Sequence, residues 1–199
     1  MEMMIIRHGQ TAGNLSGRYI GSTDEPLCAE GIAAVRKMGS IPGFDPVYVS
    51  PLGRARETAA LLFPDSRQIV CPDLREMDFG DFEGRNADEM AGDADYQSWV
   101  AGNCLTPCPN GEGLTGFTGR VTRAFSLIIE RVIRDESPRL AVVAHGGTIM
   151  ALMQEFAWPA QPFYSWHVPN ACGFKVQIDA RAWKTRQIIT DYERLEVLG

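Results

Sequence analysis

Two of the three histidines stand where a hydrophobic run gives way to glycine. His8 follows the apolar residues 3–6 and Arg7, and His145 follows the apolar residues 140–144. Such runs predict buried strands, and a polar side chain at the end of a buried strand is well placed to act in a loop. A neutral imidazole is a nucleophile and a proton carrier. The pair therefore predicts nucleophilic or acid–base chemistry at one end of a sheet.

Two arginines accompany these histidines. Arg7 adjoins His8, and Arg54 stands at the start of a helix that follows a second apolar run, residues 47–49. Guanidinium groups bind phosphate oxygens in a bidentate manner, and helix N-termini add N–H donors. We expect the two arginines and two imidazoles to hold a phosphoryl group without a metal.

Alternating strands and helices must bring these residues together. We expect strands at residues 3–6, 47–49, 68–71 and 140–144, and helices at 31–38, 52–63, 86–102, 114–134 and 148–156. Ser50 with Pro51, and later Thr148, are suitable residues to begin helices. The pattern predicts an α/β sandwich with three layers and a mainly parallel sheet, in which ligands bind beyond the carboxyl ends of the strands.

The last strands are expected at one edge of the sheet. Residues 173–178 and 186–189 resemble a pair of strands joined by a turn near Asp179. An exposed edge can pair between subunits or be covered within one. A homodimer is therefore one alternative.

Composition limits the classes of function. The chain has 199 residues, 45% of them hydrophobic, and a formal net charge of -6. It is long enough for one core and has no linker, so we expect a single domain over residues 1–199. An acidic chain is a poor partner for nucleic acids or anionic membranes. A small anionic metabolite bound by a local positive cluster fits better.

The cysteines and the N-terminus indicate a cytoplasmic protein. Five cysteines are an odd number, and they are spread through a chain too large to need disulfides. Cys104 and Cys108 lack a second pair or a nearby histidine that would complete a zinc site. Residues 1–7 lack the basic and long apolar regions of a signal peptide. We expect no metal and no cofactor.

Four motifs in order resemble the histidine phosphatase superfamily, which includes phosphoglycerate mutases and α-ribazole phosphatases. The resemblance spans most of the chain. The motifs are Arg7-His8-Gly9-Gln10-Thr11 with Asn14, Ser50-Pro51-Leu52-Gly53-Arg54-Ala55 with Glu57-Thr58-Ala59, Leu74-Arg75-Glu76 with Gly80 and Glu83-Gly84, and His145-Gly146-Gly147.

The resemblance implies a role for each catalytic residue. His8 would become phosphorylated, and Glu76 would protonate the leaving oxygen and then activate water. Arg7, Arg54 and His145 would form the phosphate pocket, where they stabilise charge on the equatorial oxygens. The arginines would favour ionised Glu76 and burial would favour its neutral form, so the sequence leaves its state open.

Other motif residues carry two interpretations. Gln10, Thr11 and Asn14 either order the loop after His8 or contact phosphate, and Gly146 belongs to the same predicted substrate site. Glu83 is expected to be a solvated acidic residue or a partner that orients an arginine. His167 lacks a matching motif and is expected to be structural or to line the rim.

The substrate side favours a phosphatase. Residues 77–84 contain no basic residue to grip a doubly phosphorylated ligand, and Phe79 stands where the mutase pattern has tyrosine. Met150 stands where the superfamily often has arginine, and Gly113 replaces a usual serine. Aromatic residues at 158, 163, 164 and 166 either wall a pocket or fill the core.

Three functions remain open. Hydrolysis of a small phosphomonoester, with α-ribazole 5'-phosphate as the named candidate, is favoured. A cofactor-dependent phosphoglycerate mutase is the second. A non-catalytic phosphate-binding or interaction module is the third, because a fold alone does not confer activity.

Overall fold

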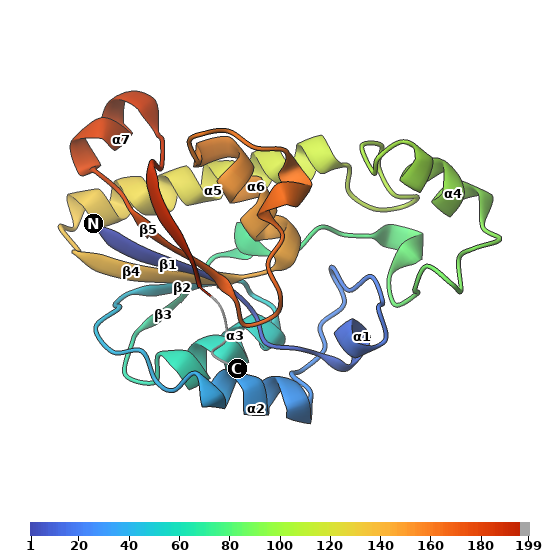
Figure 1. Ribbon diagram of the computed structural model, residues 1–199, viewed down its shortest axis with the longest axis horizontal. Helices are drawn as coiled ribbons and strands as arrows, with labels where there is room; N and C mark the ends of the chain where they lie inside the picture. The colour runs from blue at the N-terminus through green and yellow to red at the C-terminus, as the bar shows by residue number, and fades with distance from the viewer. Residues whose placement is uncertain (196–199) are drawn as a thin grey trace.

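The computed structural model describes residues 1–195 and is built on a six-stranded sheet (Figure 1). Its strands are β1 (Glu2–Arg7), β2 (Val47–Val49), β3 (Gln68–Val70), β4 (Arg139–Ala144), β5 (Gly173–Gln177) and β6 (Asp191–Leu195). Their order is β3-β2-β4-β1-β5-β6. The first four strands are mutually parallel, and β5 is antiparallel to β1 and β6. The mainly parallel α/β sandwich is confirmed.

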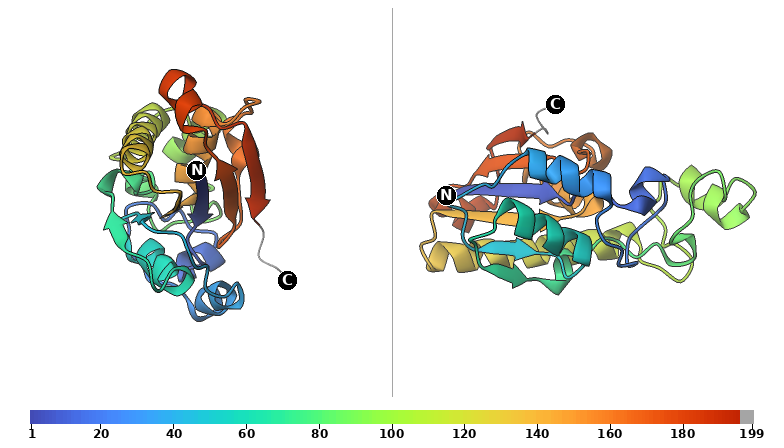
Figure 2. Two further views of the ribbon diagram at one scale, coloured as in Figure 1. Left: turned by 90° about the vertical axis from the view of Figure 1, so that its left-hand side faces the viewer. Right: turned by 90° about the horizontal axis from the view of Figure 1, so that it is seen from below.

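Helices cover both faces of this sheet. They are α1 (Ala12–Leu15), α2 (Ala29–Lys37), α3 (Gly53–Leu62), α4 (Ala94–Ala101), α5 (Leu114–Arg134), α6 (Gly146–Phe156) and α7 (Ala180–Arg186). Short 3-10 turns lie at η1 (Pro72–Leu74), η2 (Gly80–Phe82) and η3 (Phe163–Trp166). In Figures 1 and 2, α2 and α3 lie on one face and α5 and α6 on the other.

Burial explains why the central elements form. All three residues of β2 and the last five of β4 are buried, as expected for strands covered on both faces. The buried residues of α5 recur at helical spacing along one side, from Phe117 to Val132. Two hydrophobic clusters result, a larger one under α5 and α6 and a smaller one under α2 and α3.

Two predicted elements differ from the structure. Residues 186–189 are not a strand: α7 replaces the expected turn, with Asp179 accepting from the N–H groups of Arg181 and Ala182, and the strand β6 follows it. An aspartate at the N-cap position satisfies the free N–H groups of the first turn, which explains why a helix begins here. The helix expected over residues 86–102 begins only at Ala94, where Asp93 caps it.

The two predicted helix starts also need correction. Leu52, not Ser50, is the N-cap of α3, and His145, not Thr148, is the N-cap of α6. The hydroxyl of Thr148 instead donates to the carbonyl of Leu74. The hydroxyl of Ser50 still accepts a hydrogen bond from the N–H of Leu52 at 3.4 Å, whereas that of Thr148 binds a neighbouring segment.

The region beyond the carboxyl ends of the strands is built from connecting segments. Helix α1 and helix α4 lie there, and α4 is farthest from the sheet (Figures 1 and 2). Within residues 1–195, no helix has the length and apolar character needed to cross a bilayer.

Candidate active site

The parallel pairing of β1 with β4 brings the two motif histidines together. Arg7 is the register partner of Ala144, so the next residue of each strand, His8 and His145, lies at the same sheet edge. Their ring centroids are 5.0 Å apart and both side chains are buried. The sequence prediction that these histidines converge is confirmed.

The hydrogen bond of His8 defines which ring nitrogen is available. Nδ1 lies 2.6 Å from the carbonyl oxygen of Gly9. A carbonyl only accepts, so Nδ1 carries the proton and the neutral ring has its lone pair on Nε2. The backbone thus orients His8 with one nucleophilic nitrogen. The N–H of Gly9 is in turn held by Thr58, 2.9 Å away on α3.

His145 is oriented by the end of a third strand. Its Nε2 lies 2.7 Å from the Oγ of Ser50, the residue after β2. Ser50 makes this contact in addition to the hydrogen bond that it accepts from the N–H of Leu52. The sequence motif did place Ser50 near the site, but its spacing alone could not identify the partner.

Burial and positive charge keep both imidazoles neutral. Burial, with contributions from Arg54 and Arg7, holds the pKa of His8 well below its ordinary value. The pKa of His145 is lowered by burial, by His8 and by the same arginines. Both rings therefore remain uncharged to acid pH, which is the form a nucleophilic imidazole needs.

Backbone carbonyl groups hold both predicted arginines in place. Arg54 is fully buried, and its terminal nitrogens donate to the carbonyls of Thr23 and Gly21, at 2.6 and 2.8 Å. Arg7 donates to the carbonyl of Val168 at 2.8 Å. These bonds fix both guanidinium groups without neutralising their charge.

Three nitrogens of this set lack a partner. Among residues 1–195, four buried side-chain nitrogens make no hydrogen bond: Nε of Arg7, Nε of Arg54, Nδ1 of His145 and Nε1 of Trp183. Three of the four belong to the predicted phosphate pocket. Buried polar groups are nearly always paired, so this concentration indicates a place that binds a polar ligand.

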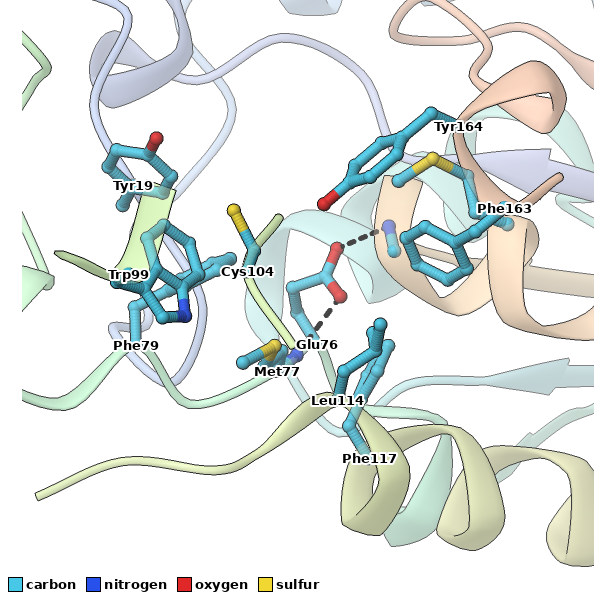
Figure 3. Close-up of a pocket in the computed structure, with 12 residues that line it drawn as sticks. Tyr19, Glu76, Met77, Phe79, Trp99, Cys104, Leu114, Phe117, Phe163 and Tyr164 are labelled. Atoms are coloured by element: carbon cyan, nitrogen blue, oxygen red, sulfur yellow. Dashed lines mark hydrogen bonds between the residues drawn. The ribbon is translucent and has the colours of Figure 1, made fainter. Parts of the chain in front are cut away.

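Glu76 lies beside the N-terminus of α6. Its carboxylate accepts from the N–H of Gly147 at 2.8 Å and from the N–H of Met77 at 3.0 Å (Figure 3). A Cβ atom on Gly147 would lie 2.4 Å from Oε1 of Glu76, so this close approach requires glycine. The second glycine of the His-Gly-Gly motif therefore has a steric role.

The ionisation state that the sequence left open is decided by burial. Burial raises the pKa of Glu76 above its ordinary value, although two backbone N–H groups, Arg54 and Arg7 act in the opposite direction. The carboxyl group consequently keeps its proton to higher pH than an exposed glutamate.

The residues after His8 order their loop. Thr11 caps α1 by accepting from the N–H of Asn14, while Oδ1 of Asn14 accepts from the N–H of Thr11. Gln10 is half-buried, and its backbone carbonyl accepts from Cys28. Gly146 begins α6, where an added Cβ would sit 3.4 Å from the Arg7 guanidinium. Contact of these residues with phosphate stays a prediction.

Glu83 has a role that differs from both predictions. Its carboxylate accepts from the N–H groups of Gly21 and Ser22 and from the hydroxyl of Thr23. It is a cap for the loop 21–23, which is the loop whose carbonyls hold Arg54. Glu83 binds there because successive N–H groups of a turn form a concave site that attracts a carboxylate.

His167 lies at the rim of the site, beside Arg7, which matches one of the two roles predicted for it. It is exposed, and its Nε2 is 3.5 Å from a terminal nitrogen of Arg7. The sequence interpretation that it has no partner is thus incomplete. Burial, Arg7 and Arg194 lower its pKa.

A cavity opens beside Glu76. It has a volume of about 230 Å³ and its walls come from well-separated segments (Figure 3). Phe163 and Tyr164 contribute to it, whereas Trp166 is buried in the core and Trp158 is 61% exposed. Of the aromatic residues noted in the sequence, Phe163 and Tyr164 thus line a pocket and Trp166 fills the core, whereas Trp158 does neither.

A family model for the histidine phosphatase superfamily (branch 1) matches residues 3–190. The chain belongs to this superfamily. The resemblance carried by the four motifs is thereby confirmed, and the chain is a histidine phosphatase by family.

The relatives include both phosphatases and mutases. The adenosylcobalamin/alpha-ribazole phosphatase of Escherichia coli (strain K12) is 33% identical over 190 residues, covering 91% of this chain and 92% of the relative. A 2,3-bisphosphoglycerate-dependent phosphoglycerate mutase of Methylobacterium radiotolerans is 34% identical over 165 residues, covering 76% of each. The structure of an alpha-ribazole phosphatase from Shigella flexneri has a TM-score of 0.79 at 28% identity, covering 100% of this chain and 96% of that one.

Two residues of this histidine phosphatase were missed by sequence reasoning. Arg120 on α5 donates to both carboxylate oxygens of Glu112 and to the carbonyls of Asp73, Arg75 and Glu76. It therefore fixes the backbone that carries the Glu76 side chain. It belongs to none of the four motifs, so the local sequence held no signal for it.

Asn170 is the second missed residue. Its Nδ2 donates to the carbonyl of His8 at 3.1 Å and to Oδ1 of Asn14 at 3.0 Å. It ties the backbone of His8 to α1 from a loop 162 positions away. That distance along the chain explains why no motif revealed it.

Within residues 1–195, possible metal ligands are dispersed. Residues 1–195 contain no set of three or more histidine, cysteine, aspartate and glutamate side chains placed to hold an ion. Cys104 and Cys108 are both free thiols.

Proposed function

We propose that this histidine phosphatase hydrolyses a small phosphomonoester by way of a phosphohistidine at His8. The observation that carries the proposal is the single lone pair on His8 Nε2, set in a buried pocket with two arginines and His145. Positioning and electrostatic stabilisation supply most of the catalysis in phosphoryl transfer. The catalytic set Arg7, His8, Arg54, Glu76 and His145 fits both requirements.

The first half-reaction transfers the phosphoryl group to the enzyme. The lone pair of His8 Nε2 forms a bond with phosphorus as the bond from phosphorus to the leaving oxygen breaks. Protonated Glu76 gives its proton to that oxygen, so the product leaves as a neutral alcohol. Arg7, Arg54 and His145 stabilise the charge on the equatorial oxygens.

The second half-reaction regenerates the enzyme. Glu76, now ionised, accepts a proton from water while the water oxygen attacks phosphorus. The bond between phosphorus and Nε2 breaks, phosphate leaves, and neutral His8 and protonated Glu76 are restored. One carboxyl group thus serves as acid and then as base.

The named substrate is α-ribazole 5'-phosphate. Two observations support this choice over a mutase substrate. Sequence relatives named alpha-ribazole phosphatases match 91% to 100% of the chain, whereas those named 2,3-bisphosphoglycerate-dependent phosphoglycerate mutases match 76% of it. The cavity beside Glu76 also contains no arginine or lysine to bind a second phosphate.

The proposal also covers the domain organisation, cellular compartment and partners of the enzyme. We expect one domain over residues 1–199 acting in the cytoplasm on a small phosphorylated metabolite, without nucleic acid or membrane as a partner. A homodimer through the outer edge of β6 would appear as a doubled mass in light scattering, and a monomeric mass would exclude it.

The test compares wild type with His8→Ala on α-ribazole 5'-phosphate and on 3-phosphoglycerate primed with 2,3-bisphosphoglycerate. Phosphate release from α-ribazole 5'-phosphate should fall by at least about 10³-fold in the variant, because the nucleophile is lost. Quenching wild type in alkali should trap phosphohistidine, and the variant should yield none.

Each other outcome rejects part of the proposal. Formation of 2-phosphoglycerate without phosphate release would identify a mutase. Phosphate release that survives His8→Ala would exclude His8 as the nucleophile. A folded wild type without either activity would support a binding module.

A further inference from the structure

The cavity beside Glu76 is lined almost entirely by apolar side chains. One wall consists of Tyr19, Phe79 and Trp99, and the opposite wall carries Phe163 and Tyr164 (Figure 3). Met150 also lines the cavity. These segments come from the loop after α1, from the turn before η2, from α4, from η3 and from α6. The tertiary structure, not a local motif, therefore creates this cavity.

The polar atoms of the first wall are engaged elsewhere. The indole N–H of Trp99 donates to the carbonyl of Thr106 at 3.1 Å, and the hydroxyl of Tyr19 lies 3.0 Å from the hydroxyl of Tyr96. The rings of Tyr19, Phe79 and Trp99 also pack edge to face, with centroids 5.2 to 6.4 Å apart. This rigid wall presents ring surface, not hydrogen-bonding groups, to the cavity.

The few charged groups in the cavity also limit which ligands it can bind. Among the described residues 1–195, Glu76 is the one carboxyl group that lines it, and no arginine, lysine or histidine does so. A carboxylate or second phosphate on the alcohol portion of the substrate would lose its hydration without gaining a cation. Aromatic rings and methionine side chains instead favour a flat apolar group.

The position of the cavity connects it with the chemistry. Glu76 lines the cavity, and the same carboxyl group is held at the N-terminus of α6 next to His145. A group bound there is on the side to which the proton is delivered, which is the side of the leaving alcohol. The cavity volume of about 230 Å³ is enough for one ring system.

From these observations, and resting on the proposed function, we infer that the enzyme selects its substrate by an uncharged aromatic ring on the leaving alcohol. Tyr164 and Met150 are the specificity-determining residues. Both line the cavity without full burial, so their substitution changes the cavity more than the core. The phosphate pocket then binds and transfers the phosphoryl group, and the cavity distinguishes between leaving alcohols.

The experiment compares substrates with the same leaving-group chemistry. Ethyl phosphate, glycerol 3-phosphate and 2-(2-naphthyl)ethyl phosphate are all esters of primary alcohols. Burial of the ring should raise kcat/KM for the naphthyl ester over ethyl phosphate by about 30- to 100-fold in wild type. Glycerol 3-phosphate should be no better than ethyl phosphate.

Matched variants locate the preference. Tyr164→Ala should reduce the naphthyl-to-ethyl ratio by about 10-fold, because it removes ring contact. Trp158→Ala removes an equally exposed aromatic residue outside the cavity and should leave the ratio unchanged. Met150→Arg should reduce the ratio and raise relative activity on 3-phosphoglycerate, whereas Met150→Leu should retain the wild-type ratio.

The outcomes separate this inference from the proposed function. A wild-type ratio near one, or equal effects of Tyr164→Ala and Trp158→Ala, would overturn the inference even if His8→Ala abolishes phosphate release. Phosphate release that is insensitive to His8→Ala would overturn the proposed function instead. Direct binding of 2-(2-naphthyl)ethanol, weakened by Tyr164→Ala but not by Trp158→Ala in calorimetry, should accompany the expected ratio.

Discussion

At the scale of single residues, the site pairs a neutral base with a protonated acid. His8 is held neutral by burial and by the arginines, since its pKa is far below the ordinary value. Glu76 keeps its proton to higher pH than an exposed glutamate does, because burial raises its pKa. Two ionisable groups whose environments shift their pKa values in these directions are suited to act as nucleophile and general acid in one step.

These shifts set the pH dependence of the first half-reaction. Activity requires neutral His8, which exists above its lowered pKa, and protonated Glu76, which exists below its raised pKa. For an alkyl phosphate, kcat/KM should therefore be greatest between the lowered pKa of His8 and the raised pKa of Glu76, and it should fall as the pH rises through the Glu76 pKa. Glu76→Gln should lower this value by about 10²- to 10⁴-fold, because the leaving oxygen is no longer protonated.

Hydrolysis of p-nitrophenyl phosphate provides the control for Glu76. Its leaving group needs little protonation, so the loss in kcat/KM should be much smaller. Equal losses on the alkyl and p-nitrophenyl substrates would remove Glu76 from the acid role.

At the scale of elements, the N-terminus of α6 fixes the acid. The N–H of Gly147 binds Glu76, and an extra Cβ at that residue would lie 3.1 Å from its carboxyl carbon. From the other side, Arg120 of α5 binds the carbonyl oxygen of Glu76 at 3.3 Å. Two helices from different parts of the chain therefore determine where the proton is delivered.

Gly147→Ala should displace Glu76 and lower kcat/KM for alkyl phosphates by about 10-fold or more, because catalysis is sensitive to small misplacements. The control Gly119→Ala makes the same change on α5, where nothing lies within 4 Å of the added Cβ. It should retain activity and slightly increase thermal stability. Activity of Gly147→Ala equal to that of Gly119→Ala would show that the Glu76 contact is not needed.

At the scale of the whole molecule, the sheet between two helix layers is the rigid support of the site. Ile129 of α5 is fully buried in the larger cluster, whereas Leu127, two positions earlier, is 61% exposed. The histidines stand at the ends of strands in the middle of this support. The cavity walls, by contrast, come from connecting segments beyond it (Figure 1).

Ile129→Ala should lower the free energy of unfolding by about 2–5 kcal/mol, because it leaves a cavity in the core. Leu127→Ala should change it by no more than about 0.5 kcal/mol. Denaturant titration measures both values, and the folded fraction of either variant should keep its wild-type kcat. Equal destabilisation would contradict the assignment of Ile129 to the core side of α5.

The amino-acid sequence by itself determined the central strands, the helices that flank them and the motif residues. Short apolar runs and helical spacing are local signals. Because an apolar run ends just before His8 and another just before His145, the sequence alone places each of these histidines at the end of a strand. The sequence also predicted α3, α5 and α6 to within two residues at each end. It failed at residues 186–189, where a weakly patterned segment left helix and strand undistinguished.

Only the tertiary structure decided the partners of these side chains. Ser50 binds His145, Asn170 binds the backbone of His8, and Arg120 binds that of Glu76. Each contact joins residues at least 44 positions apart, so no local pattern records it. The ionisation of Glu76 and the apolar cavity beside it were decided in the same way, because burial is a property of the packed chain and not of the residue.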